Sequence, residues 1–195
     1  MNNIASGDAS FDDAEVNYYD FSKTEVESTD KQKLLPATNN TSSAQTLSGT
    51  FAEVVTSSTW ESYVKEGTNH YVADAAGKSN ASAYLVITYS ITVNTPASHN
   101  IGNYVVTLTA GAGKTSDIVL LVESGFGGVG ALSTTNTFAA YDSSANTRSL
   151  AATSAAGKYS FRVIAWLNGV TVTDSTAAIT AQDLLTASAA FVANS

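Results

Sequence analysis

Residues 83–93 read Ala-Tyr-Leu-Val-Ile-Thr-Tyr-Ser-Ile-Thr-Val, and this stretch decides the fold. Successive side chains on a β-strand point to opposite faces, so strict alternation predicts a strand with one apolar and one more polar face. β-branched and aromatic residues dominate it, as a pleated, half-buried surface favours. The apolar face consists of Ala83, Leu85, Ile87, Tyr89, Ile91 and Val93.

The same alternation recurs along the chain between turn signals. It predicts about ten strands, which is typical of an all-β fold with two packed antiparallel sheets, a β-sandwich. Residues 103–109 and 117–123 are expected to pair as a hairpin, and 177–186 can form a short helix. The other expected strands cover residues 13–22, 47–55, 60–66, 69–74, 82–94, 137–141, 148–152, 159–167, 170–173 and 185–193.

Composition excludes several classes of protein. Of the 195 residues, 44% are hydrophobic, which is enough for a core, and only 13% are charged, about half the usual share. The net charge of −8 and the absence of a basic stripe argue against nucleic acid and an anionic membrane surface as partners. Without cysteine there are no disulfides or thiol chemistry. No apolar run is long enough for membrane insertion.

Acidic residues concentrate near the N-terminus. Asp8, Asp12, Asp13 and Glu15 are possible calcium ligands, because calcium takes several oxygen ligands. The spacing fits no EF-hand, so a solvated acidic face is the alternative. We therefore expect no required cofactor, with calcium as a possible one.

Three asparagines begin Asn-x-Ser/Thr triplets, namely Asn39, Asn40 and Asn80. Their place in polar connections suits glycosylation of an exported protein. Such triplets also arise by chance in a chain this rich in Ser, Thr and Asn.

No catalytic constellation can be assembled from the sequence. Residues 125–130 match the G-x-G-x-x-G pattern, but the segment that follows is poor helix material, so the pattern indicates a connection rather than a nucleotide site. His70 and His99 are the only histidines, and no nucleophile–base pair stands out. We expect that the protein is not an enzyme.

Aromatic residues on strands suggest a different function. Trp60, Tyr63, Tyr159 and Trp166 can be read as a sugar-stacking platform of a carbohydrate-binding or adhesin module. Core packing explains aromatic residues on strands equally well.

Two stretches resemble a family of secreted, filament-forming jelly rolls related to TasA and camelysin, which includes archaeal bundling pili and cannula subunits. The segment Lys33-Leu34-Leu35-Pro36, followed by residues 47–54, is similar to the "L-x-P-G then alternating strand" near the start of that domain, although Ala37 replaces the usual glycine. Residues 157–169, with the final strand to Phe191, are similar to its late "Y-x-F-x-V-x-x-W-L-x-G" strand and hairpin.

The resemblance implies a jelly-roll subunit that forms a homopolymer by donor-strand complementation. Residues 1–20 would be an extended arm, with Ile4, Ala9, Phe11 and Val16 as donor side chains, and residues 21–195 one sandwich domain. It also implies an extracellular or cell-surface location, with a signal peptide already removed. If the first twenty residues were folded onto their own chain or hung free, with no other chain touching them, this mechanism would fail.

Two readings compete with this one. The arm can be a disordered terminus. The start of the chain, which lacks a leader, also suits a phage or virion tube or decoration protein.

Overall fold

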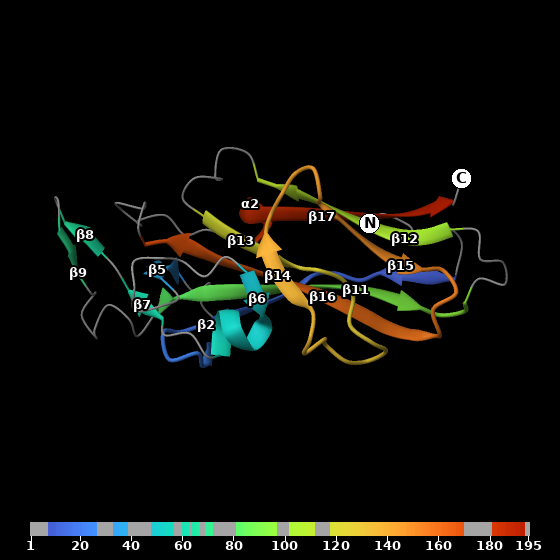
Figure 1. Cartoon of the computed structure of the whole chain (residues 1–195), viewed down its shortest axis with the longest axis horizontal. Coiled ribbons are helices and arrows are strands. Elements are labelled where there is room, and N and C mark those ends of the chain that lie inside the picture. Colours follow the sequence, from blue (N-terminus) through green and yellow to red (C-terminus); the bar gives the residue numbers. More distant parts are fainter. Residues whose placement is uncertain are drawn as a thin grey trace.

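The computed structural model describes residues 8–26, 33–38, 48–56, 60–62, 64–66, 69–71, 81–96, 102–111, 118–169 and 181–193. The expected all-β fold is confirmed: two antiparallel sheets face each other in a sandwich (Figure 1). The jelly-roll connectivity stays a prediction. No helix among these residues has the length and apolar character needed to cross a membrane.

The large sheet has β11 and β16 at its centre. Its main order is β3 (Glu25–Val26), β2 (Glu15–Tyr19), β11 (Tyr84–Val93), β16 (Gly157–Asn168), β13 (Ile118–Glu123), β14 (Thr137–Ala140) and β6 (Ser48–Thr50). Three short strands extend it: β1 (Ala9–Phe11) pairs with β11, β5 (Pro36–Thr38) pairs in parallel with β16, and β7 (Glu61–Ser62) pairs with β5.

The small sheet has three strands in the order β15 (Thr147–Ala151), β12 (Gly102–Ala110) and β17 (Leu185–Ala193). Outside both sheets, β4 (Lys33–Leu34) pairs in parallel with β10 (Ala81–Ser82). The expected hairpin near residue 67 is confirmed as β8 (Val64–Glu66) and β9 (Asn69–Tyr71). The helical elements are η1 (Ala52–Thr56), a π-helical turn, and α2 (Ala181–Leu184), within the segment expected to allow a short helix.

The main core lies between the sheets. It uses the apolar face predicted for β11, because Leu85, Ile87, Tyr89, Ile91 and Val93 are buried there. They pack with Tyr159, Phe161, Val163, Ala165 and Leu167 of β16, which also alternate. Tyr104, Val106 and Leu108 of β12 cover them from the small sheet. Period-2 alternation thus chose the correct inner face of β11. Ala83, which we expected on that face, instead packs in the second apolar cluster with Tyr84 and Val86.

A second apolar cluster covers part of the outer face of the large sheet. Tyr84 and Val86 of β11 lie there with Ile164 and Trp166 of β16, beneath side chains from η1 and Trp60. The first half of β11 is therefore buried on both faces, although its sequence predicts one more polar face.

The expected strand over 47–55 is wrong beyond residue 50. Gly49 has a backbone φ of +136°, which residues with a side chain rarely adopt, and the chain then turns into η1. The Glu53 carboxylate accepts hydrogen bonds from the Thr50 amide (2.7 Å) and hydroxyl (2.9 Å). The Glu53 amide donates back to the Thr50 hydroxyl. This is a capping box, a local helix signal in Thr50-Phe51-Ala52-Glu53 that outweighs the alternation.

The expected hairpin between 103–109 and 117–123 is also wrong. Strand β12 pairs with β15 and β17, whereas β13 pairs with β14 and β16 in the other sheet. The chain therefore crosses from one layer to the other between these strands. Alternation shows that a segment is a strand but not which strand it pairs with.

Candidate functional site: the N-terminal strands and the groove beside them

The described part of the expected arm belongs to the large sheet. Strand β1 pairs with β11 from Ala9 opposite Val93 to Phe11 opposite Ile91. Strand β2 continues the ladder, from Glu15 opposite Thr88 to Tyr19 opposite Tyr84. Residues 8–19 thus differ from the extended arm that we expected, because β11 of their own chain offers them an open edge and an apolar surface.

A β-bulge joins the two short strands. Residues 12–14 face only residues 89 and 90 of β11, so β1–β2 carries one extra residue, and the Asp12 amide donates to the Ser90 carbonyl at 3.0 Å. The extra residue changes which positions face inward. Ala9 and Phe11 pack on the core before the bulge, and Val16 and Tyr18 do so after it.

Three of the four predicted donor side chains contact the core of their own chain. Ala9 is buried, the Phe11 ring stacks 6.3 Å from the Tyr89 ring, and Val16 packs against the same cluster. Ile4 lies outside the described residues.

The four acidic residues have separate surroundings. One Asp12 oxygen accepts from the Thr92 hydroxyl at 2.9 Å and lies 3.9 Å from Lys158 Nζ. The Asp8 carbonyl accepts from two amides of the chain after β11, Asp13 is exposed, and Glu15 lines a groove described below. Within the described ranges, no three Asp, Glu or His residues are grouped closely enough to hold a metal ion. Calcium binding stays a prediction, without support from these contacts.

The other predicted surface residues divide into two groups. Asn39, Asn40 and Asn80 lie outside the described residues. Trp60, Trp166 and Tyr159 are buried, and the two indole rings meet edge to face at 5.3 Å. These aromatic residues form core rather than an open sugar-stacking platform, and Tyr63 lies outside the described residues.

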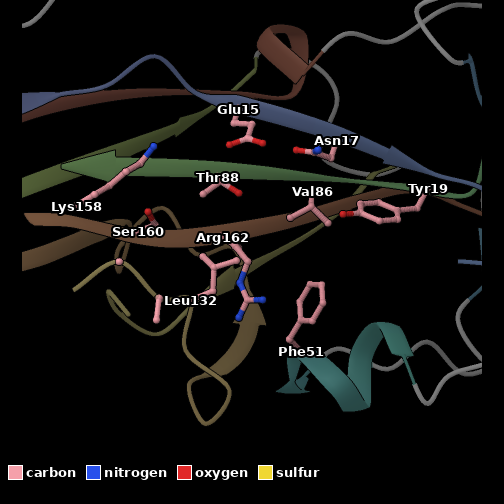
Figure 2. A pocket seen from close by; sticks show the side chains of 12 residues that line it. Glu15, Asn17, Tyr19, Phe51, Val86, Thr88, Leu132, Lys158, Ser160 and Arg162 are labelled. Carbon is pink, nitrogen blue, oxygen red and sulfur yellow. The ribbon is translucent and has the colours of Figure 1, made fainter. Parts of the chain in front are cut away.

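A groove of about 400 Å³ lies on the outer face of the large sheet, next to β2 (Figure 2). Its floor is Val86 and Thr88 of β11 with Ser160 of β16, and these side chains are short. One wall comes from β2 through Glu15, Asn17 and Tyr19, and the other from residues 130–132. Phe51 lies toward one end of the groove and Lys158 toward the other, with Arg162 between them (Figure 2).

Burial raises the pKa of the Tyr19 hydroxyl, and the negative charges of Glu25 and Glu15 raise it further. The hydroxyl therefore stays protonated at neutral pH and can donate a hydrogen bond. The ring is held by stacking on Tyr84, with centroids 4.9 Å apart.

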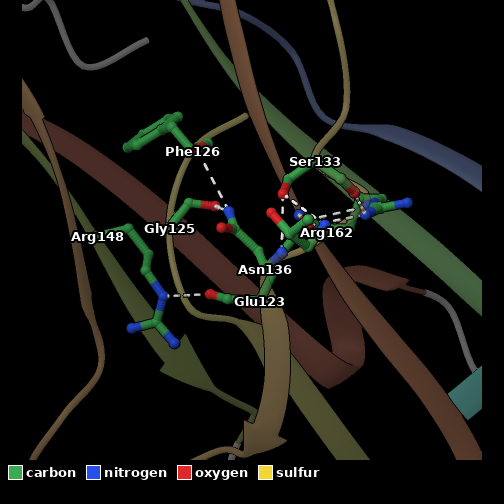
Figure 3. Close-up of polar contacts among 8 residues, drawn as sticks. Glu123, Gly125, Phe126, Ser133, Asn136, Arg148 and Arg162 are labelled. Carbon is green, nitrogen blue, oxygen red and sulfur yellow. Dashed lines mark hydrogen bonds and ion pairs between the residues drawn. The ribbon is translucent and has the colours of Figure 1, made fainter. Parts of the chain in front are cut away.

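A buried ion pair fixes Arg162 between the groove and the second cluster. Its guanidinium donates to both carboxylate oxygens of Glu123, at 2.7 and 3.0 Å, and its amide donates to the same carboxylate at 2.8 Å (Figure 3). The guanidinium lies 4.2 Å from the centre of the Phe51 ring, in cation–π contact. Glu123 is fully buried, so its charge depends on this partner.

The same network anchors the loop that forms the second wall. Arg162 also donates to the Ser133 carbonyl at 2.6 Å, and the Asn136 amide group donates to the Gly125 carbonyl at 2.9 Å (Figure 3). The Arg162 side chain thus ties the loop 124–136 to β16, and the Asn136 side chain ties the end of the loop to its start.

The loop at residues 125–130 runs along β16, and Gly127 lets it fold closely on itself. The Gly127 and Gly130 amides donate to the carbonyls of Ser160 and Lys158, both at 2.8 Å. A Cβ at Gly127 would lie 2.3 Å from the Ala131 carbonyl oxygen. Turns and bends follow, with no helix, so this pattern is a connection as predicted.

Comparison with known proteins found no match: no family model, no curated protein and no solved structure. The resemblance to filament-forming jelly rolls therefore stays a prediction. Sequence reasoning also missed the groove and the Glu123–Arg162 pair. A charged residue among apolar neighbours on each of two expected strands was the available signal, because a buried charge requires a partner.

Proposed function

We propose that this chain is an extracellular structural subunit that forms a homopolymer by exchanging its N-terminal strands. In the polymer, residues 8–19 of one copy lie on β11 of the next copy. The ladder from β1 and β2 to β11 carries the proposal, because it shows a sheet edge filled by an N-terminal segment. Main-chain hydrogen bonds give such strand addition its affinity, and alternate side chains fix its register.

Pairing within one copy leaves no vacancy on β11, so assembly requires exchange rather than simple insertion. The same bonds form on a copy's own β11 and on a neighbour's. The balance therefore depends on protein concentration and on the connection between Val26 and Lys33. Donor and acceptor are different surfaces, so the contact is head-to-tail and gives an open fibre unless it closes into a ring.

Burial explains why the edge of β11 should always be filled. Ala9, Phe11, Val16 and Tyr18 pack against the main core. Covering a large apolar side chain contributes about 1.5–3 kcal/mol, so an uncovered β11 is unfavourable. A copy that loses its own strands is expected to take those of a neighbour.

Burial of the aromatic side chains argues against a carbohydrate-binding module but does not bear on a virion protein. A carbohydrate-binding module built on Trp60, Trp166 and Tyr159 is not proposed, because these side chains are buried. A virion tube or decoration protein stays the second reading. It would use the same strand exchange and differ in where the polymer is found.

The chain has no cysteine, so engineered thiols can test the exchange directly. Ser10 lies opposite Thr92 across the β1–β11 ladder, at a separation that suits a disulfide. The single variants Ser10→Cys and Thr92→Cys are mixed at high concentration and oxidised. A disulfide joining one variant to the other is expected, and electron microscopy should show fibres.

The control uses Val105 and Ser149, which lie opposite each other in the small sheet. Mixed Val105→Cys and Ser149→Cys variants are expected not to join specifically. If the Ser10/Thr92 mixture behaves like this control, while the double variant closes an internal disulfide, strands are not exchanged and the proposal fails.

A further inference from the structure

We propose that the groove beside β2 binds a short neutral oligosaccharide. The site lies on the face of the large sheet rather than at an edge. Its β2 wall occupies the same place on β11 in the monomer, where it comes from the same copy, and in the proposed polymer, where it would come from a neighbour. Its volume of about 400 Å³ falls within the range of ligand pockets, about 300–1,000 Å³. Three observations select this ligand: how the backbone is used, which charges are paired, and which side chains line the groove.

The backbone argues against a peptide strand. Extended peptides bind by adding main-chain hydrogen bonds at a sheet edge. Here β11 lies between β2 and β16, and the loop amides of Gly127 and Gly130 bond to β16. The sheet backbone beneath the groove is therefore already paired, and a ligand there is held mainly by side chains.

The charges argue against an anionic ligand. Arg162 is paired with Glu123 in a two-oxygen contact, and Lys158 lies 3.9 Å from Asp12. Glu15, on the opposite wall, adds a negative charge. No lining cation lacks a carboxylate, so an anion gains little and an uncharged polar ligand fits better.

The remaining side chains match a sugar. Thr88 and Tyr19 supply hydroxyls, and the Ser160 hydroxyl, which shares a 2.8 Å hydrogen bond with the Ser90 hydroxyl, keeps a further lone pair for a ligand. The Asn17 amide nitrogen donates to Glu25, which leaves the amide oxygen as an acceptor. Leu132, which is 46% exposed, supplies an apolar surface on the facing wall, where the C–H face of a sugar ring can pack. Donors, acceptors and an apolar wall together are what a polyhydroxylated ligand needs.

The test is calorimetric titration of the monomeric protein with neutral gluco-, manno-, galacto- and N-acetylglucosamine oligosaccharides at millimolar concentrations. We expect saturable binding of at least one of them. Thr88→Val, which keeps the side-chain shape, and Leu132→Ala should each weaken it at least tenfold, about 1.4 kcal/mol. Thr107→Val, on the outward face of the small sheet, is the matched control and should bind normally.

Three outcomes would overturn the proposal: no neutral saccharide binds, a peptide or an anionic saccharide binds instead, or binding is unchanged in both groove variants. Amide chemical shifts near Thr88 and Ser160 provide an independent map of the ligand. Because the monomer is used, failure here leaves strand exchange untouched, and failure of the cross-linking test leaves the groove untouched.

Discussion

The two ends of the outer face of the large sheet are built from the same two strands but have opposite character. At one end, Tyr84 and Val86 of β11 lie with Ile164 and Trp166 of β16 under a covering layer. At the other end, Thr88 opposite Arg162, Ser90 opposite Ser160 and Thr92 opposite Lys158 form a polar part. Ser90 and Arg162 are buried there, whereas the other four side chains reach the surface. A single strand face can therefore be core and surface in turn, and the change occurs at Arg162.

The largest expected contrast in stability comes from truncating one side chain at each end of β16. Trp166→Ala removes a fully buried indole that contacts Trp60, so we expect a loss of about 3–5 kcal/mol in the free energy of unfolding. Lys158→Ala, on the same face, should stay within about 0.5 kcal/mol, since this side chain is half exposed. Urea denaturation measures both. Similar losses at the two ends would remove the distinction between them.

The boundary itself depends on the buried ion pair. Glu123→Gln removes the charge that compensates Arg162 and should cost about 3 kcal/mol in urea denaturation. The double variant Glu123→Gln with Arg162→Met should recover most of that loss, because no buried charge is left unpaired. If the double variant is as unstable as Glu123→Gln alone, hydrogen-bond geometry rather than charge pairing accounts for the stability that this ion pair contributes.

The smallest expected effect concerns the cover over the apolar end. Hydrogen bonds from the Thr50 amide and hydroxyl hold the pKa of Glu53 below its ordinary value. A lowered folded-state pKa gives stability that is present above the unfolded pKa and is lost as pH falls through the folded pKa. Glu53→Gln should therefore reduce the difference in stability between neutral and acidic pH. An acid dependence equal to that of the unaltered chain would show that the cap contributes nothing to it.

Parts of the fold could be predicted because they depend on neighbouring residues. The alternation at 83–93 and 185–193 placed two strands, it placed the inward face of the first from Leu85 to Val93, and turn signals placed the hairpin near residue 67. The candidate site was harder. The groove needs three strands and a loop together, and Glu123 and Arg162 are 39 residues apart in sequence.

By itself, the sequence determined the all-β class, most strand positions and the residues that face the main core, because side-chain alternation is a property of the extended backbone. Only the tertiary structure decided that β12 and β13 lie in different sheets, that residues 8–19 pair with β11, and that half of the outer face is covered. Those outcomes depend on contacts between distant segments, whose burial and hydrogen bonding no local pattern records.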